Sequence, residues 1–126
     1  MDLKKLYQEQ LVEHYNHPRC TAPLARVDRS SGICNPSCGD MVTIEVMLEG
    51  SVITQARFAA QGCVISCATA SLLLHTVTGN TVEEIQKLDT EFMKNLVGIP
   101  LGPTRLRCAL LALEALQTCL QKESNA

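Results

Sequence analysis

The sequence predicts an α+β domain in which helices pack on a small antiparallel sheet of about three strands. Three observations support this fold class. An amphipathic segment opens the chain, two segments with period-two alternation follow it, and the second half consists mainly of apolar segments with helical spacing. The expected order of elements is α-β-β-β-α-α-α. With its 126 residues, the whole chain, 1–126, is expected to form one domain with its own core.

Residues 2–15 are predicted to form the first helix. The apolar positions that recur at helical spacing are Leu3, Leu6, Tyr7, Leu11 and Tyr15. Charged and amide side chains occupy the other side of this helix. Pro18 ends it, because a proline disfavours helical backbone in the residue before it. The stretch 19–41 contains two prolines and two glycines, and it is expected to be mostly loop with a short strand near Leu24–Val27.

The next segment is predicted to be a β-hairpin. Apolar side chains alternate with other side chains from Val42 to Leu48, and again from Val52 to Ala60. Between the two runs, the sequence Glu-Gly-Ser at 49–51 supplies a turn. The hairpin therefore accounts for two of the predicted strands.

The second half of the chain is predicted to be helical. Residues 63–77 are apolar or small on nearly every side, which indicates a buried helix that ends at Gly79. A Thr-x-x-Glu capping box opens a further helix over 81–88. A short helix is expected around 91–96, and leucines at helical spacing across 106–120 indicate the last one.

Composition excludes several classes of function. The net charge is −2, and the chain has no tryptophan, two tyrosines and two phenylalanines. Neither a basic face nor an aromatic stacking surface for nucleic acid is therefore expected. The most apolar stretch, 63–74, is too short to cross a bilayer and is interrupted by hydroxyl side chains. The predicted location is the cytoplasm, without a membrane partner.

Seven cysteines are many for a chain of this length. They are Cys20, Cys34, Cys38, Cys63, Cys67, Cys108 and Cys119. In a reducing compartment, clustered cysteines more often bind metal or carry out chemistry than form disulfides. The odd number also fits a complete disulfide framework poorly.

Three of these cysteines stand where the chain is predicted to change direction. Cys38 lies in a loop before a strand, Cys63 at a strand-to-helix junction, and Cys108 near the start of the last helix. Helix N-termini favour negative charge, which lowers the pKa of a thiol. With Asp40 as an exchangeable oxygen ligand, these thiolates could form a tetrahedral site for zinc or iron. The alternative for each cysteine is that it is a small buried hydrophobic side chain. This alternative stays open because the spacing of the cysteines matches no local CxxC zinc signature.

The remaining cysteines and Arg107 are not expected to be metal ligands. Cys67 is expected to be a core residue of the buried helix, although it follows Cys63 by one helical turn. Cys34 is expected to be a loop thiol that lies near the site by accident. Cys20 and Cys119 are expected to have no part in the site. Arg107 either balances the negative charge of the thiolates or is a solvated surface residue. It is not a ligand, because a guanidinium stays protonated.

Three separated segments resemble the motifs of the IscU/SufU/NifU N-terminal family. They are NPSCGD at 35–40, QGCVISCATAS at 61–71 and RLRC at 105–108. The opening segment HYNHPR at 14–19 is also similar to the start of that family. The resemblance covers essentially the whole chain, with the motifs in the same order.

The resemblance implies an iron–sulfur cluster assembly scaffold with an α+β fold. Cys38, Cys63 and Cys108 would be the cluster ligands, with Asp40 as the fourth metal ligand. The cargo would be a transient [2Fe-2S] cluster or iron, and zinc is the alternative occupant. A cysteine desulfurase would donate persulfide sulfur, with Cys108 as the first acceptor. Apo iron–sulfur proteins would receive the cluster, and a dimer around a shared cluster is compatible with this picture.

The chain departs from each branch of that family. Arg107 stands where IscU-type members carry a histidine, and 99–104 lacks their Leu-Pro-Pro-Val-Lys segment. A basic residue before the third cysteine resembles the SufU type. However, only 44 residues lie between Cys63 and Cys108, so the insertion usual in that type is absent. A cluster scaffold is therefore the first hypothesis, zinc-dependent sulfur transfer the second, and a structural zinc domain the third.

Overall fold

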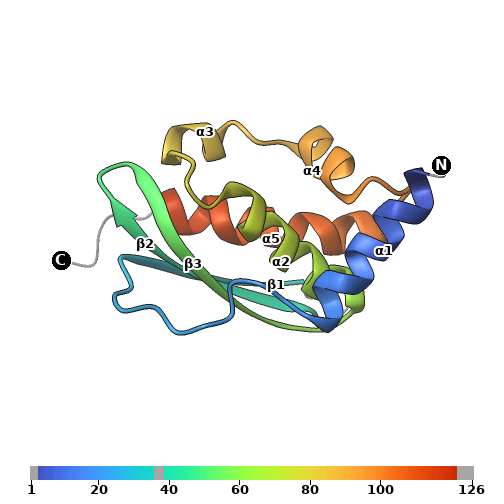
Figure 1. The fold of residues 1–126 in the computed structure, drawn as a ribbon, viewed down its shortest axis with the longest axis horizontal. Coiled ribbons are helices and arrows are strands. Elements are labelled where there is room, and N and C mark those ends of the chain that lie inside the picture. The colour runs from blue at the N-terminus through green and yellow to red at the C-terminus, as the bar shows by residue number, and fades with distance from the viewer. Residues whose placement is uncertain (1–2, 36–38, 122–126) are drawn as a thin grey trace.

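The computed structural model of the protein describes residues 3–35 and 39–121 (Figure 1). In chain order, its elements are α1 (Leu3–Asn16), β1 (Arg29–Cys34), β2 (Met41–Glu49), β3 (Val52–Gln61), α2 (Val64–Val77), α3 (Val82–Gln86), α4 (Thr90–Val97) and α5 (Pro103–Gln121). The predicted α+β class and the order of a helix, three strands and then helices are confirmed. The short segment expected around 91–96 forms a helix of its own, α4.

The three strands form one antiparallel sheet in the order β1-β2-β3. Strand β2 is central, and its Ile44 lies opposite Ser31 of β1 and Phe58 of β3. The period-two pattern that predicted the hairpin arises because one face of the sheet is buried and the other carries polar side chains. Alternate residues of β2 are fully buried, whereas on the other face Glu45 forms an ion pair with the opposing Arg57 at 2.9 Å.

Helices α2 and α5 cover one face of this sheet, and α3 and α4 lie beyond them (Figure 1). Helix α1 packs against α2 at one end of the molecule. The main core lies between the sheet and the two long helices. Its fully buried large side chains include Ile44, Ile53, Leu73, Leu74, Ile85, Met93 and Leu116. Among the described residues, no helix combines the length and apolar character needed to cross a membrane.

The strand that precedes the hairpin, β1, lies later in the chain than predicted. It is formed by Arg29–Cys34 and not by Leu24–Val27. The guanidinium of Arg26 instead donates to Asp28 at 2.9 Å and to the carbonyl oxygen of Leu48 at 3.0 Å, so this segment leads into the strand. Strand β1 is rich in serine and glycine, so it has no apolar alternation to reveal it. Backbone pairing with β2 sets its position.

The buried face of α1 also differs from the predicted one. Leu6 and Tyr15 are 43% and 45% exposed, whereas Leu11 and His14 are buried. Helix α1 contacts the rest of the protein along a narrow face turned to α2. The spacing of apolar residues therefore located the helix correctly but assigned too wide a buried face.

Caps define the helices that follow the sheet. Cys63 is the N-cap of α2, and its thiol accepts a hydrogen bond from the backbone N–H of Ser66. Thr81 and Glu84 form the predicted capping box of α3. That helix ends at Gln86, two residues before the predicted boundary at Leu88. The cap on α2 places a thiol at a helix N-terminus.

Candidate metal and sulfur site

Three potential ligand residues meet at one end of the sheet. They are Asp40, Cys63 and Cys108, whose ligand atoms all lie within 4.8 Å of one another. Asp40 directly precedes β2, Cys63 lies between β3 and α2, and Cys108 is in α5. Two sulfurs and one oxygen are the donor types that zinc and iron accept. The three donors therefore fit a tetrahedral metal with one position left for a further ligand.

Strand pairing explains why Asp40 and Cys63 are neighbours. Met41 at the start of β2 lies opposite Gln61 at the end of β3, so the residues flanking them are also adjacent. Gly62 makes this approach feasible, because a Cβ atom there would lie 2.1 Å from Asp40 Oδ1. Its φ of +132° also lies in a region that favours glycine. The backbone N–H of Cys63 then donates to Asp40 Oδ1 at 3.2 Å.

A buried hydroxyl, that of Ser66, connects all three ligand residues. Its Oγ donates to Asp40 Oδ2 at 2.7 Å. The same oxygen lies 3.5 Å from Cys63 Sγ and 3.5 Å from the carbonyl oxygen of Cys108. Ser66 is fully buried in the first turn of α2. Both carboxylate oxygens of Asp40 are thus held by the first turn of this helix.

These contacts keep Asp40 ionised. The hydrogen bond from Ser66 is the main cause that lowers its pKa to about 2, against the opposing effect of burial. Hydrogen bonds from Cys108 and Cys63 act in the same direction as that from Ser66. Asp40 is therefore a carboxylate at neutral pH and can act as an oxygen ligand.

The two thiols of the site differ in exposure. Cys63 is exposed, whereas Cys108 is buried. Burial is the main cause that raises the pKa of Cys108 to about 12, and hydrogen bonds with Cys63 and Asp40 add to the effect. The expectation that its place near a helix start would lower this pKa is therefore wrong, because Cys108 lies in the interior. Without metal, the Cys108 thiol keeps its proton and Cys63 is the accessible thiol.

The fourth predicted ligand, Cys38, lies outside the described residues. The described residues nearest to it in the chain, Asn35 and Gly39, lie next to the site. Asn35 donates its backbone N–H to the carbonyl oxygen of Asp40 at 2.8 Å, and Gly39 donates to that of Asn35 at 2.8 Å. Gly39 has a positive φ of +74°, a backbone conformation that favours glycine.

The other described cysteines are not part of the group of three potential ligands. Cys67 is half-buried one helical turn after Cys63, and not the core residue that was expected. Burial is the main cause that raises its pKa, and the charges of Cys63 and Asp40 act in the same direction. Cys34 is exposed at the end of β1, Cys20 is half-buried in the loop after α1, and Cys119 is fully buried in the core.

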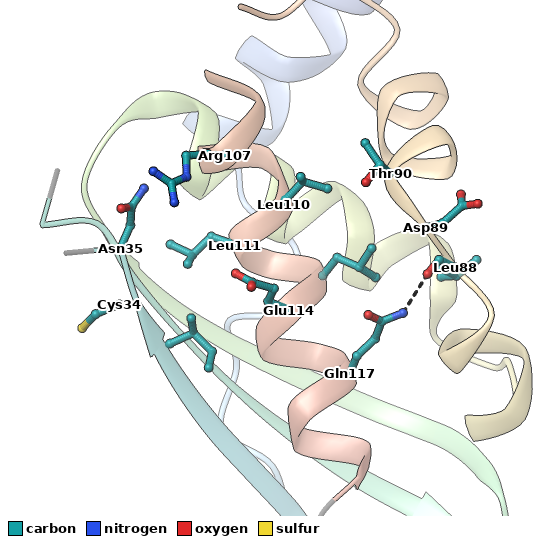
Figure 2. Close-up of a pocket in the computed structure, with 12 residues that line it drawn as sticks. Cys34, Asn35, Leu88, Asp89, Thr90, Arg107, Leu110, Leu111, Glu114 and Gln117 are labelled. Carbon is teal, nitrogen blue, oxygen red and sulfur yellow. Dashed lines mark hydrogen bonds between the residues drawn. The ribbon is translucent and has the colours of Figure 1, made fainter. Parts of the chain in front are cut away.

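A groove of about 550 Å³ runs along α5 beside the site (Figure 2). Its walls are the end of β1, the outward face of α5 and the connection between α3 and α4. Arg107 and Asn35 line the end of the groove nearest to Cys108, and the Arg107 side chain is exposed. Because Arg107 is solvated and adjacent in sequence to a ligand residue, it can reach a charged partner without being a ligand itself.

Two polar features were not found from the sequence. One is the role of Ser66, and the other is a buried contact between α1 and α2. There, His14 Nδ1 lies 2.7 Å from Ser71 Oγ, which also accepts from the backbone N–H of Arg19 at 2.8 Å. The available signal was the presence of hydroxyl residues inside an otherwise apolar helix. However, the sequence could not show which partners those hydroxyls would meet.

Residues 6–124 match the family described as the NifU-like N terminal domain. The chain belongs to this family. The resemblance noted in the three cysteine motifs is thus confirmed over nearly the whole chain. The family match agrees with the geometry of the site. The three potential ligand residues come from the three motif segments 35–40, 61–71 and 105–108.

Named relatives in the NifU-like family fall into two functional types. The iron–sulfur cluster assembly scaffold protein IscU of Thermotoga maritima is 31% identical, with 99% of each chain covered. The zinc-dependent sulfurtransferase SufU of Bacillus subtilis is 29% identical, with 98% of this chain and 95% of that protein covered. The N-terminal part of a NifU-like protein from Brucella abortus has the same fold, with a TM-score of 0.74 at 21% identity and 94% of both chains covered.

Proposed function

We propose that this protein is a scaffold for iron–sulfur cluster assembly, formed as one domain by 1–126. It accepts iron and persulfide sulfur, holds the growing cluster as cargo, and passes it to apo iron–sulfur proteins. The observation that carries the proposal is the convergence of Asp40, Cys63 and Cys108 within 4.8 Å, in a chain of the NifU-like N-terminal family. Relatives named as cluster assembly scaffolds support it.

The proposed ligands are Cys38, Asp40, Cys63 and Cys108. Cys38 is included because its motif places it two residues before Asp40 and because its neighbour Gly39 is held beside the site. Three thiolates and one carboxylate form a mixed set, and the oxygen is the weaker ligand for a thiophilic metal. Asp40 is therefore the exchangeable position, which suits a site that must release its cargo.

The chain's own residues contribute to loading in distinct ways. Asp40 is ionised before any metal arrives, so it provides a negative charge that attracts a cation. Cys108 carries a proton without metal, and this proton must leave when the sulfur becomes a ligand. We propose a cytoplasmic site of action, because a reducing compartment keeps clustered cysteines available for metal binding and sulfur chemistry.

A cysteine desulfurase is the proposed sulfur donor. An acceptor thiolate attacks the terminal sulfur of the donor's persulfide, so the acceptor becomes a persulfide and the donor leaves as a thiolate. The resemblance assigned the acceptor role to Cys108. Of the two described thiols at the site, Cys63 is exposed and Cys108 is buried, so we propose that Cys63 accepts sulfur first and that Cys108 participates later.

A zinc-dependent sulfur carrier is the second candidate. A SufU relative that covers nearly the whole chain favours it, as does Arg107, which cannot replace a histidine ligand. In this case Asp40, Cys63 and Cys108, with Cys38, would hold zinc as a resident cofactor. The zinc would keep the thiols ionised as metal-bound thiolates and orient them.

Anaerobic assembly with and without zinc distinguishes the two candidates. The protein is incubated with ferrous iron, cysteine and a cysteine desulfurase, while visible absorbance and desulfurase turnover are recorded. A scaffold should accumulate roughly half to one two-iron cluster per chain, the range expected if chains share clusters. Added zinc should inhibit this assembly by occupying the thiolates.

The two candidates predict opposite results for zinc-loaded protein. A scaffold loaded with zinc should neither assemble a cluster nor accelerate the desulfurase. If zinc-loaded protein strongly accelerates desulfurase turnover and no cluster ever accumulates, the protein is a carrier and the scaffold proposal is wrong. A protein that does neither under any metal condition would contradict both candidates.

A further inference from the structure

Persulfide delivery raises a problem of oxidation state. The terminal sulfur of a persulfide is formally at the zero level, whereas a cluster contains sulfide, which is two electrons more reduced. An accessible thiol can supply these electrons, because thiol–persulfide exchange can release hydrosulfide and leave a disulfide. A second thiol next to Cys63, outside the proposed ligand set, would meet this requirement.

Cys67 meets that description. It lies on the same helix, and its backbone N–H donates to the carbonyl oxygen of Cys63 at 3.3 Å, so the two residues are separated by one turn. Side chains on an α-helix tilt toward its N-terminus, so the thiol of Cys67 is directed back over the turn that Cys63 caps. Residues at this spacing in a helix have Cβ atoms about 5–6 Å apart, whereas a disulfide requires about 3.5–4.5 Å, so the backbone of one residue must shift for the bond to form.

Cys63 is the residue that can make this adjustment. As the N-cap of α2, it has extended backbone dihedrals, with φ of −74° and ψ of 164°, and it stands outside the regular helix. Its side chain is exposed. A small movement of Cys63 can thus bring the two sulfurs together without breaking the helix that holds Cys67.

Cys67 can also be reached from solvent. It is half-buried and lines a hollow of about 510 Å³ between α1, the following loop and β3, together with residues such as His14 and Phe58. The Cys67 residue is therefore accessible to small solutes from this side of α2. Among the described residues, Cys119 is enclosed in the core, and Cys20 and Cys34 lie in other elements.

We propose that Cys67 resolves a persulfide on Cys63, so that sulfur is released as hydrosulfide within the site. The Cys67 sulfur attacks Cys63 Sγ, the Cys63–Cys67 disulfide forms, and the bond to the terminal sulfur breaks. The proton of Cys67 passes to the departing sulfur, which leaves as HS⁻. The two thiols supply the two electrons, and an external thiol must reduce the disulfide before the next cycle. This inference rests on the proposed function, because it requires a persulfide on Cys63.

A single-turnover experiment tests the inference. Metal-free protein is loaded with a desulfurase and limiting cysteine, then separated from both and kept without reductant. Hydrosulfide is measured with time, and tryptic peptides are analysed by mass spectrometry. Cys63 and Cys67 lie on one tryptic peptide, Phe58–Lys87. The persulfide appears as an added sulfur mass on this peptide, and the disulfide as the loss of two hydrogens.

In wild-type protein, the added sulfur mass should decay as hydrosulfide appears and as the disulfide form of the peptide accumulates. Cys67→Ser should load normally, keep its persulfide and release hydrosulfide at least about tenfold more slowly, because a hydroxyl is a poor nucleophile toward sulfur. Cys67→Ala should behave in the same way, so a folding defect in one variant does not decide the outcome. Cys34→Ser, which removes an exposed thiol from another element, should release hydrosulfide as wild type does.

The outcomes separate this inference from the function on which it rests. If the protein loads persulfide but Cys67→Ser releases hydrosulfide at the wild-type rate, Cys67 is not the resolving thiol and sulfur acceptance still stands. Absence of the disulfide from wild-type peptide that has released hydrosulfide overturns the inference in the same way. If no persulfide forms on Cys63, both the inference and the proposed acceptor role are wrong.

Discussion

The Ser66 hydroxyl occupies the centre of the site without being a ligand candidate itself. It donates to Asp40 Oδ2, while the N–H of Cys63 donates to Oδ1. Each carboxylate oxygen therefore has a hydrogen-bond partner at the start of α2, which fixes the plane of the carboxylate before metal binds. Hydrogen-bond partners of ligands commonly determine ligand orientation in metal sites. Ser66 is thus a positioning residue for Asp40.

Ser66→Ala should weaken metal binding without unfolding the protein. The alanine retains the backbone N–H that caps α2 through Cys63, but Asp40 loses its shortest hydrogen bond in this site. Loss of such a partner lowers metal affinity by about tenfold to a hundredfold. Zinc affinity, measured by competition with a chromogenic chelator, should fall by this factor.

The matched control for this change is Thr69→Val. Thr69 lies one turn further along α2, and its buried hydroxyl has no hydrogen-bond partner among the residues that the structure describes. Its replacement should therefore leave zinc affinity unchanged. Equal affinities for Ser66→Ala and wild type would show that the carboxylate is positioned by other groups.

His14 should make folding stability depend on pH. Burial is the main cause that lowers its pKa from 6.5, the positive charges of Arg19 and His75 act in the same direction, and Glu13 opposes them. The unfolded chain then binds a proton that the folded chain excludes. The free energy of unfolding should therefore decrease as pH falls from about 6.5 toward the lowered pKa, and it should be constant above about 7.5.

Urea unfolding at about pH 5.5 and 7.5 measures this contribution. His14→Asn keeps a polar atom near Ser71 but does not titrate, so it should lose less stability between these two pH values than wild type. His17→Asn, at an exposed position of the same segment, should match wild type. A His14→Asn variant with the full wild-type pH dependence would exclude His14 as the source.

At the level of elements, the junction between β3 and α2 positions the site. Gly62 joins the two elements with a φ of +132° and lies against Asp40. The strand pairing brings Asp40 to this junction, and the helix that begins after Cys63 supplies Ser66. The ligand geometry thus depends on one residue that has no side chain.

Gly62→Ala should abolish tight metal binding. A Cβ atom would meet Asp40 Oδ1 at 2.1 Å, so the carboxylate must move out of the site. Gly79→Ala is the control, because Gly79 has a φ of +98° and no heavy atom within 4 Å of the added Cβ. Both variants should lose about 1–3 kcal/mol of stability from backbone strain, measured by urea unfolding.

Only Gly62→Ala should lose zinc affinity. Retention of wild-type affinity in this variant would show that Asp40 can leave its observed position without consequence. In that case, Asp40 would not be a ligand that the site requires.

Local sequence patterns predicted the elements whose packing produces a periodic apolar pattern or whose cap is a local motif. Strands β2 and β3 were located because one face of each is buried, and α3 because its cap is a local motif. Strand β1 was misplaced, because its pairing with β2 depends on residues far away in the chain.

The same distinction explains what was predicted about the site. Asp40, Cys63 and Cys108 were predicted as one site from their residue types and from the family resemblance, and the structure brings their side chains together. The high pKa of Cys108 was missed because burial depends on how α5 packs. The role of Ser66 was missed because its partners lie 26 and 42 residues away in the chain.

At the scale of the whole molecule, the ligand residues connect its layers. Asp40 is attached to the sheet, Cys63 to the junction of the sheet with α2, and Cys108 to α5. A metal bound by all three would therefore link the sheet to both helices that cover it. Binding of this kind stabilises the fold as a whole, because the unfolded chain does not bring these residues together.

Zinc should therefore raise the midpoint of thermal unfolding. At a free zinc concentration a hundred times the dissociation constant, the stabilisation is about 2.7 kcal/mol, which corresponds to a shift on the order of 10 °C for a domain of this size. Cys63→Ser should remove most of the shift, because it replaces the sulfur ligand at the junction. Cys34→Ser, at the end of β1 and outside the group of ligand atoms, should retain it. Calorimetry of the three proteins with and without zinc provides the measurement. If Cys34→Ser loses as much of the shift as Cys63→Ser does, the metal is held elsewhere, and the group of Asp40, Cys63 and Cys108 is not the site that binds it.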